Sequence, residues 1–370
     1  MINTAHQRFG GAVQVALSFI NECRNIIEHE YIVILGPGLQ RLVSKSEFPE
    51  NFTFVNLDFG AINLKKIFVL NKVLKKLEEK YRPDVIISTT GPTYFKSTAP
   101  QVIGFNLGLY LYPESPYLQS ISGISRIKFA LKRRLHYYFF KRDATAFVTQ
   151  TDDVNQRVRK ELGCDKVYTV TNAASSYYNQ PECFPNKLKP KTDSLYRFVT
   201  ISALYQHKNL ELIGDIVKIL EQRGHKNFEF VLTIKREELG QVFKGQAHIT
   251  TVGPVAPKEC PSLYRECDAM FLPTLAECFS ASYPEAMIMD KPIITTDLGF
   301  ARSICGDAAL YFKAKDAEAA ADQIEILLED KELEATLIAK GHEELKKFDS
   351  PLIRAKKYIE ICASMAKAQT

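Results

Sequence analysis

Two carboxylates stand eight positions apart in the segment PTLAECFSASYPEAM, residues 273–287. Glu277 falls in a loop that we expect after the apolar segment AMFLP, which has the composition of a buried strand. Glu285 falls in the first turn of a helix that we expect to start around Ser282 to Pro284, because proline is tolerated there. Since carboxylates accept hydrogen bonds from hydroxyl groups, this pair suits a ligand with hydroxyls at both ends.

The backbone between the two carboxylates indicates what the middle of such a ligand contains. It lies between the carboxyl end of a strand and the start of a helix, where free N–H groups and the helix dipole favour phosphate. A nucleoside-diphosphate sugar has this chemistry, with ribose hydroxyls, a diphosphate and a hydroxylated ring. The alternative needs no ligand: Ser282 and Glu285 match an S-x-x-E capping box, and Glu277 is then a solvated loop acid.

The elements that must position these residues follow an α/β rhythm. Short strand-like segments alternate with amphipathic helical ones such as IFVLNKVLKKLEEKY, which predicts parallel sheets covered by helices. The predicted strands span residues 31–35, 52–57, 84–89, 145–150, 166–172, 197–202, 228–234, 248–253, 269–273 and 292–296. In the second half we also expect a helix from Asn209 to about Arg223.

The rhythm stops once, in the lysine- and proline-containing segment SSYYNQPECFPNKLKPKTDS. We therefore predict four parts: a first Rossmann-like domain, a linker, a second Rossmann-like domain and a final amphipathic helix. Their ranges are 1–175, 176–195, 196–349 and 350–370.

Composition excludes several classes of protein. An apolar fraction of 46% predicts large cores, and a formal charge of +5 without a long basic run does not indicate a nucleic-acid partner. The eight cysteines are scattered, which is typical of buried thiols in a reducing cytoplasm. No segment reaches the roughly 20 apolar residues of a membrane span. No D-x-D motif occurs, so we expect no cofactor and no obligatory metal.

The segment LYRECDAMFLPTLAECFSASYPEAMIMDKPIITTD, with GDAALYF after it, resembles the C-terminal signature of family-4 retaining glycosyltransferases, including their E-x7-E motif. The resemblance is close over most of residues 195–350 and looser in the first half. It implies the GT-B fold: two Rossmann-like domains that face each other across a cleft, with a C-terminal helix that crosses back to the first.

The resemblance also implies roles for individual residues of the second domain. Glu285 resembles the acid that binds the donor ribose, and Glu277 the one near the transferred sugar. Lys208 resembles the basic residue that neutralises the departing diphosphate; its alternative is a surface lysine before a helix capped by Asn209. The family's arginine a few residues earlier has no counterpart here. The amides expected over the sugar and phosphate are those of Phe279, Ser280, Ala281 and Ser282.

In the first domain, the pair Gly10 and Gly11 precedes a helix with apolar residues at helical spacing, namely Val13, Leu17, Ile20 and Ile27. In the family a similar loop lies near the acceptor and the donor phosphate; a tight turn is the alternative. The strand expected before this loop is either very short or incomplete at the start of the sequence. Asn106 lies where family members often carry a histidine facing the transferred sugar, so we place it on the acceptor side.

Residues 124–142 interleave seven cations with aromatic and aliphatic residues. One reading is a helix that rests on an anionic membrane, in which case the acceptor is lipid-linked. The other is a core-facing helix with a solvated basic face.

Together these observations predict a cytoplasmic retaining glycosyltransferase that moves a sugar from a nucleoside diphosphate to a sugar or lipid-linked sugar, as in bacterial polysaccharide synthesis. Under the membrane reading it is peripheral to the inner face of the plasma membrane. Two alternatives stay open. One is a non-catalytic nucleotide-sugar-binding partner on the same fold, and the other is a sugar-nucleotide epimerase.

Overall fold

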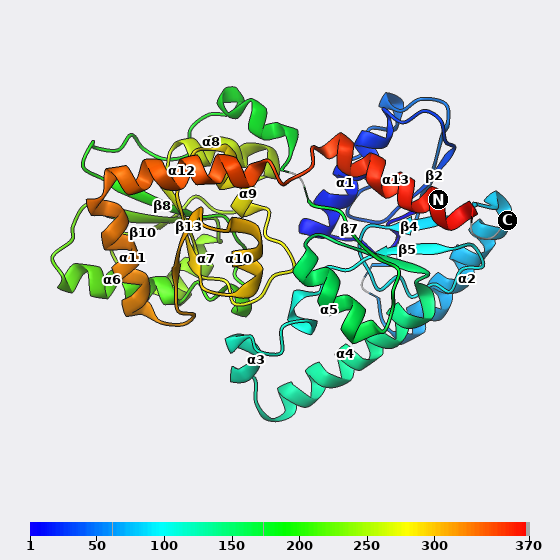
Figure 1. Cartoon of the computed structure of the whole chain (residues 1–370), viewed down its shortest axis with the longest axis horizontal. Helices are drawn as coiled ribbons and strands as arrows, with labels where there is room; N and C mark the ends of the chain where they lie inside the picture. The colour runs from blue at the N-terminus through cyan, green and yellow to red at the C-terminus, as the bar shows by residue number, and fades with distance from the viewer. Residues whose placement is uncertain (61, 173, 368–370) are drawn as a thin grey trace. The chain divides into compact units, whose positions relative to one another are not determined.

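The computed structural model describes residues 1–60, 62–172 and 174–367 and divides into two compact units (Figure 1). The first unit comprises Met1–Leu111, Ser122–Ala173 and Asp349–Thr370, and the second comprises Tyr112–Ile121 and Ala174–Phe348. Each unit contains one parallel sheet with helices packed against it, so the predicted pair of Rossmann-like domains is confirmed.

The first unit is built on a seven-stranded parallel sheet in the order β3-β2-β1-β4-β5-β6-β7. Its strands are β1 (Ile2–Asn3), β2 (Tyr31–Leu35), β3 (Phe52–Asn56), β4 (Ile86–Ser88), β5 (Gln101–Gly104), β6 (Ala146–Thr149) and β7 (Val167–Thr169). The first strand has only two residues, yet it is central, because Ile2 pairs with both Val33 and Ile87. Strand β5 was not among the predicted strands.

The helices described in the first unit are α1 (Gly11–Cys23), α2 (Leu64–Tyr81), α4 (Gly123–Asp143), α5 (Asp152–Leu162) and α13 (Pro351–Lys367). Local signals set several of their ends. The Thr151 hydroxyl accepts the Val154 amide at the start of α5, and Gly163 ends that helix with a left-handed φ of 63°. Helix α1 ends at Cys23, so Ile27 does not belong to its apolar face and is exposed instead.

The last helix packs onto the first helix, so the predicted return of the C-terminal helix to the first unit is confirmed. The rings of Phe19 in α1 and Tyr358 in α13 lie 5.2 Å apart. Arg354 of α13 is almost fully buried and donates to Ser18 Oγ at 2.7 Å and to Asn172 Oδ1. A separate cluster around Leu70 and other residues of α2 forms the second core of this unit.

The second unit has a six-stranded parallel sheet in the order β10-β9-β8-β11-β12-β13. Its strands are β8 (Tyr196–Thr200), β9 (Phe228–Leu232), β10 (Ile249–Thr251), β11 (Ala269–Leu272), β12 (Ile293–Thr296) and β13 (Ala309–Phe312). Its helices are α3 (Pro116–Ser120), α6 (Leu212–Gln222), α7 (Arg236–Phe243), α8 (Cys260–Arg265), α9 (Ser282–Ile288), α10 (Gly299–Cys305), α11 (Ala317–Glu329) and α12 (Lys331–Leu345).

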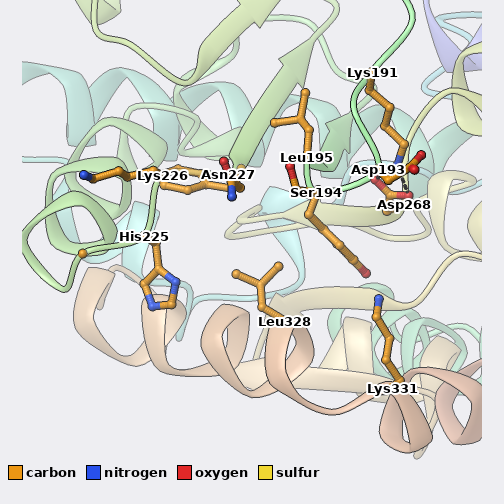
Figure 2. Close-up of a pocket in the computed structure, with 13 residues that line it drawn as sticks. Lys191, Asp193, Ser194, Leu195, His225, Lys226, Asn227, Asp268, Leu328 and Lys331 are labelled. Carbon is orange, nitrogen blue, oxygen red and sulfur yellow. Dashed lines mark hydrogen bonds and ion pairs between the residues drawn. The ribbon is translucent and has the colours of Figure 1, made fainter.

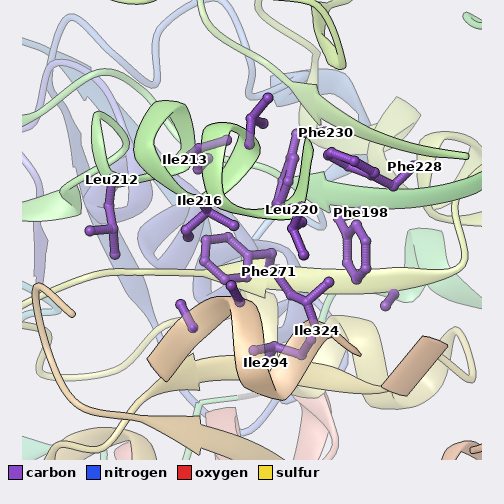
Figure 3. Close-up of a cluster of buried hydrophobic side chains, with 14 of the residues drawn as sticks. Phe198, Leu212, Ile213, Ile216, Leu220, Phe228, Phe230, Phe271, Ile294 and Ile324 are labelled. Carbon is purple, nitrogen blue, oxygen red and sulfur yellow. The ribbon is translucent and has the colours of Figure 1, made fainter. Parts of the chain in front are cut away.

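Phenylalanines pack among leucines and isoleucines in a core of the second unit (Figure 3). The rings of Phe198 and Phe230 stack at 5.2 Å, and the ring of Phe271 meets Phe230 edge-on at 5.4 Å. Ile216 from α6 and Ile324 from α11 close this core and are fully buried. The strands that lead into the site described below are therefore well packed within this core.

Short 3-10 turns complete the chain: η1 (Lys45–Glu47), η2 (Gly108–Tyr110), η3 (Ser176–Asn179), η4 (Pro181–Cys183), η5 (Gln206–Lys208) and η6 (Pro257–Glu259). Two of them, η3 and η4, lie in the segment 176–195. This segment is tied to α8 and the residue after it, because Ser262 Oγ donates to Phe184 O at 3.0 Å and Glu266 accepts the Lys187 amide at 2.9 Å.

Candidate functional site

The order of strands in the second sheet places two of the predicted site residues at one point. Strands β8 and β11 are neighbours, and the sequence order runs away from them in opposite directions, which makes a topological switch point. Ligands of open α/β sheets bind outside the carboxyl ends of strands at such points. Lys208 follows β8 and Glu277 follows β11.

The loop after β8 is shaped by a left-handed residue. Residues Gln206–Lys208 form η5, and Asn209 follows with a φ of 53°, a conformation that asparagine tolerates better than most residues. Helix α6 begins only at Leu212, so the prediction of a helix from Asn209 is wrong. The reading of Lys208 as a surface lysine before an Asn209 cap is wrong as well, because its side chain is only 17% exposed.

Lys208 and Glu277 form an ion pair that the two loops hold in place. Lys208 Nζ donates to Glu277 Oε1, and the Thr274 hydroxyl donates to the same oxygen at 3.0 Å. The Leu275 amide donates to His207 O at 2.8 Å, which ties the backbones of both loops together. An ammonium group has three donors, so Lys208 can contact Glu277 and a phosphate oxygen at once.

His207, next to the lysine, is held in its neutral form. Burial lowers the pKa of the His207 imidazole, an effect that the nearby Glu277 carboxylate opposes. Its ring stacks against Tyr205 with 5.8 Å between centroids. The positive charge at this switch point therefore comes from Lys208.

Glu285 lies in the first turn of α9, as predicted, but not as a helix cap. Ala281 is the N-cap residue of this helix, and no side chain caps it, so the capping-box reading of Ser282 and Glu285 is wrong. The Glu285 side chain is half-buried, and burial raises the pKa of its carboxyl to about 7, while the nearby Tyr178 hydroxyl lowers it. No described cation forms an ion pair with it. Sequence reasoning missed Tyr178, which lies in a segment without any periodic pattern.

The four residues whose amides were predicted to contact the ligand connect Glu277 to Glu285. Within the part of the chain that the structure describes, the amides of Phe279, Ser280, Ala281 and Ser282 donate to no other residue. The Phe279 ring meets Phe348 edge-on at 6.0 Å, which anchors the middle of this loop. The loop thus presents backbone donors between two carboxylates.

The predicted site residues of the first unit follow its own switch point between β1 and β4. Gly10 and Gly11 are exposed at the start of α1, and Gly10 has a φ of 76°. A Cβ at either glycine meets no atom within 4 Å, so Gly10 is required by its backbone conformation and not by a close neighbour. Asn106 follows β5, and its Oδ1 is buried without a partner among the described residues.

Further polar groups without partners follow the same strands. They are His6 Nδ1 and Gln7 Oε1 after β1, and Thr93 Oγ1 after β4. The Gln7 amide group donates to Thr90 Oγ1 at 3.0 Å, which joins the two loops. Burial lowers the pKa of His6 to about 4, so its imidazole is neutral. Sequence reasoning missed these residues, although His6 and Gln7 lie shortly after the short strand β1.

Helix α4, for which the sequence left a membrane-bound and a core-facing reading open, carries one buried and one exposed set of apolar residues. Phe139 and Phe140 are buried, whereas a second set at helical spacing is exposed: Ile124, Ile127, Leu131, Leu135 and Tyr138. Two of the seven cations are engaged within the protein, because Arg133 pairs with Glu161 and Arg142 with Asp143. None of the described helices is both long and apolar enough to span a bilayer.

A cavity of about 550 Å³ lies at the opposite end of the second sheet (Figure 2). It is lined by residues at the starts of β8 and β9, such as Tyr196 and Phe228, and not by the residues at the strand ends. Several of its polar side chains already have partners, since Lys191 binds Asp268 and His225 Nε2 lies 2.7 Å from Glu325 Oε1. We therefore assign the candidate site to the switch point.

Among residues 1–60, 62–172 and 174–367, no group of three or more His, Cys, Asp or Glu side chains is arranged to hold a metal ion. None of the eight cysteines forms a disulfide in the described chain, and six of them are buried.

Comparison with known families and structures agrees with this geometry. Residues 196–330 match the family model described as glycosyl transferases group 1. No curated protein sequence matches the chain.

Solved structures of low sequence identity share the fold over nearly the whole chain. Sucrose-phosphate synthase from Thermosynechococcus elongatus is 13% identical, with a TM-score of 0.74 over 99% of this chain and 98% of that one. WaaG, a glycosyltransferase involved in lipopolysaccharide biosynthesis, is 12% identical, with a TM-score of 0.73 over 98% of both chains. Anabaena Alr3699/HepE in complex with UDP and glucose is 14% identical, with a TM-score of 0.69 over 98% of both chains.

These neighbours confirm the GT-B fold that the sequence resemblance implied. Residues 196–330 of this fold match the group 1 glycosyl transferase model, and this match supports a transferase.

Proposed function

We propose that the protein is a retaining glycosyltransferase that moves a sugar from a nucleoside-diphosphate sugar to a hydroxyl group of a sugar or lipid-linked sugar. The observation that carries the proposal is the Lys208–Glu277 ion pair at the switch point between β8 and β11, inside the region that matches the glycosyltransferase model. It brings a phosphate-binding cation and a hydroxyl-binding anion to one place.

Each group then has one role in the transfer. Glu285 binds the ribose hydroxyls, Glu277 binds hydroxyls of the transferred ring, and Lys208 binds the diphosphate between them. The bond from the anomeric carbon to the phosphate oxygen breaks, and the departing diphosphate keeps the electron pair. Lys208 stabilises that charge as it develops.

Retention follows when the acceptor hydroxyl attacks from the face that the diphosphate leaves. The acceptor oxygen forms the new bond to the anomeric carbon, and its proton passes to the departing phosphate oxygen. No protein base is needed for this step, and Lys208 supplies the charge that a metal ion would otherwise supply. We therefore propose that transfer needs no metal, so activity should survive treatment with a chelator.

A thermal-shift screen tests the donor half of the proposal. We would measure Tm with UDP, GDP and ADP and with their common sugar derivatives, because a ligand at 100 times its Kd adds about 2.7 kcal/mol. One nucleotide should raise Tm selectively, and Glu285→Ala should weaken its binding by roughly 1 to 3 kcal/mol. A folded protein that binds none of them would contradict the proposal. Binding without transfer would indicate a non-catalytic partner, and interconversion of free nucleotide sugars an epimerase.

The acceptor side is supported by the unpartnered polar groups of the first unit. His6 Nδ1, Gln7 Oε1, Thr93 Oγ1 and Asn106 Oδ1 follow the adjacent strands β1, β4 and β5. Buried polar atoms without partners are costly unless a ligand or water satisfies them. A hydroxyl-rich acceptor supplies both donors and acceptors. Asn106→Leu should therefore raise KM for the acceptor while the Kd of the free nucleotide stays unchanged.

Helix α4 supports a peripheral contact with an anionic membrane. Its exposed apolar stripe, Ile124 to Tyr138, is flanked by five exposed cations: Arg126, Lys128, Lys132, Arg134 and Lys141. Apolar side chains enter the interface between head groups and acyl chains, and each nearby cation adds about 1 kcal/mol on an anionic surface. We place the protein at the inner face of the plasma membrane, where a lipid-linked polysaccharide precursor is the acceptor. The likeness to WaaG, which is involved in lipopolysaccharide biosynthesis, agrees with such a pathway.

Vesicle sedimentation tests this contact. The protein should bind vesicles that contain phosphatidylglycerol, not vesicles of phosphatidylcholine alone, and high salt should weaken the binding. Leu131→Glu should abolish it. The matched control is Ile326→Glu, because Ile326 is exposed on α11 in the other unit. Equal binding by the two variants would contradict the assignment of the surface.

A further inference from the structure

Ten residues from the first half of the sequence, Tyr112–Ile121, fold as part of the second unit. The chain before them, through Leu111, and the chain after them, from Ser122, belong to the first unit. We call Tyr112–Ile121 the strap. It contains α3, which starts at Pro116 with Ser115 as its N-cap.

Both parts of the strap are anchored to the second unit. The Tyr112 ring meets Phe300 of α10 edge-on at 5.9 Å, and Tyr112 is buried. Lys315 Nζ donates to the Pro116 carbonyl at 3.1 Å. These contacts fix the segment on both sides of Ser115.

Ser115 fixes the backbone that leads to Glu277. Its side chain is 2% exposed, and its hydroxyl donates to the Leu275 carbonyl at 2.7 Å. The amide of the same Leu275 donates to His207 O at 2.8 Å. Leu275 is therefore held from the strap through its carbonyl and from the loop after β8 through its amide.

Tyr117 contacts the loop that carries Lys208. Its hydroxyl donates to Gln206 Oε1 at 3.2 Å, and its ring meets the His207 ring edge-on at 6.1 Å. Gln206 and His207 precede the lysine within η5. The strap thus contacts both of the loops that form the Lys208–Glu277 pair.

We propose that the strap is a positioning element of the transfer site, and that Ser115 is its principal residue. This inference rests on the proposed function of the Lys208–Glu277 pair. Both loops lie beyond the ends of their strands, so sheet hydrogen bonds do not fix them. The hydrogen bond between the loops and the contacts with the strap do so instead. Displacement of reacting groups by about 1 Å lowers the rate up to about 100-fold.

Ser115→Ala tests the proposal, with Ser120→Ala as the matched control. Ser120 lies at the end of the same helix, is exposed, and donates to Tyr117 O at 2.7 Å within the strap. The donor is whichever of UDP-glucose, GDP-mannose and ADP-glucose gives the largest thermal shift. The readouts are kcat for release of the nucleoside diphosphate, KM for the donor, and Kd for the free nucleotide.

We expect Ser115→Ala to lower kcat by roughly 10- to 100-fold while KM and Kd change by less than about twofold, because Glu285 still binds the ribose. Ser115→Thr, which keeps the hydroxyl, should restore most of kcat. A kcat for Ser115→Ala equal to that of Ser120→Ala would overturn the proposal, as would a parallel loss of kcat and nucleotide affinity.

If Ser115→Ala does not fold, Tyr117→Phe decides the question. This half-buried side chain keeps its ring and loses only the hydroxyl that contacts Gln206. A lower kcat with unchanged Kd supports the strap, and unchanged kcat overturns it. Absence of nucleotide binding by the native protein would instead contradict the proposed function itself.

Discussion

Substitution of Glu285 by glutamine should change how the stability of the protein depends on pH. Glutamine keeps the shape of the side chain and cannot ionise. In the native protein, burial raises the pKa of the Glu285 carboxyl from 4.5 to about 7. The folded state therefore holds a proton that the unfolded chain releases above pH 4.5, and the native protein loses stability as pH rises from about 4.5 to about 7.

The size of this effect follows from the same linkage. A rise from 4.5 to about 7 corresponds to about 3 kcal/mol of folding free energy, as an upper value for a half-buried group. For a unit of this size, about 3 kcal/mol corresponds to a Tm difference of roughly 6 to 12 °C. Glu285→Gln avoids the loss. It should match the native protein near pH 4.5 and exceed its Tm above about pH 7.

The assay is a series of thermal unfolding curves between about pH 5 and 8.5 for the native protein, Glu285→Gln and the control Glu237→Gln. Glu237 is exposed on α7, and its substitution makes the same change of side chain at the surface of the second unit. With UDP, GDP or ADP present, the order of the two Tm values should reverse, so that the native protein unfolds at a higher temperature than Glu285→Gln. Ribose hydroxyls donate to the carboxylate and favour its ionised form, so only native Glu285 should bind the nucleotide more tightly as pH rises toward about 8.

A Tm difference between native protein and Glu285→Gln that stays constant across this pH range would refute the raised pKa. If the Tm difference varies with pH as expected but both proteins bind the nucleotide with equal affinity, the raised pKa is confirmed and Glu285 has no role in donor binding.

Other substitutions test the ion pair and the packing of the sheets. Lys208→Met and Glu277→Gln should each lower kcat, Lys208→Met by roughly 100- to 1,000-fold. Because these side chains share a hydrogen bond, the double variant should lose less than the product of the two single losses, and additive losses would contradict the pairing. Gly104→Ala should destabilise the first unit by roughly 1 to 3 kcal/mol or more, because the new Cβ overlaps the Thr89 carbonyl oxygen. Gly240→Ala, in a helix with open space around it, should raise stability by roughly 0.5 to 1 kcal/mol, and calorimetry of both variants checks this contrast.

Local patterns predicted most strands of both sheets, because a buried strand is a short apolar run between turn residues. Strands β5 and β13 were not among the predicted strands, and β5 has a local cause. Strand β5 (Gln101–Gly104) begins with a glutamine and ends with a glycine that contacts the neighbouring strand. The predicted start of α6 was three residues too early. Asparagine is a common N-cap residue, but Asn209 adopts a left-handed conformation and the helix begins only at Leu212.

The candidate site divides in the same way. Glu277 and Glu285 lie within one strand–loop–helix segment, so their places in a loop and in a first helical turn followed from sequence. The groups that lie near these two glutamates in the folded protein did not follow from the sequence. Tyr178 lies near the Glu285 carboxyl but belongs to a segment without a periodic pattern. Ser282 and Glu285 match a capping box in sequence, but the box does not form, because the helix starts one residue earlier than a Ser282 cap requires.

The sequence by itself determined the alternation of strands and helices and the two Rossmann-like halves, and it led to the residues that we propose for nucleotide-sugar binding, because these depend on residue type and short-range spacing. Only the tertiary structure decided which groups meet. Lys208 and Glu277 are 69 residues apart and meet because β8 and β11 are neighbours in the sheet. Ser115 and Leu275 are 160 residues apart and meet because the strap folds with the second unit. Strand order and the docking of distant segments depend on which faces of the sheets and helices are buried against each other. A local sequence pattern does not give this information.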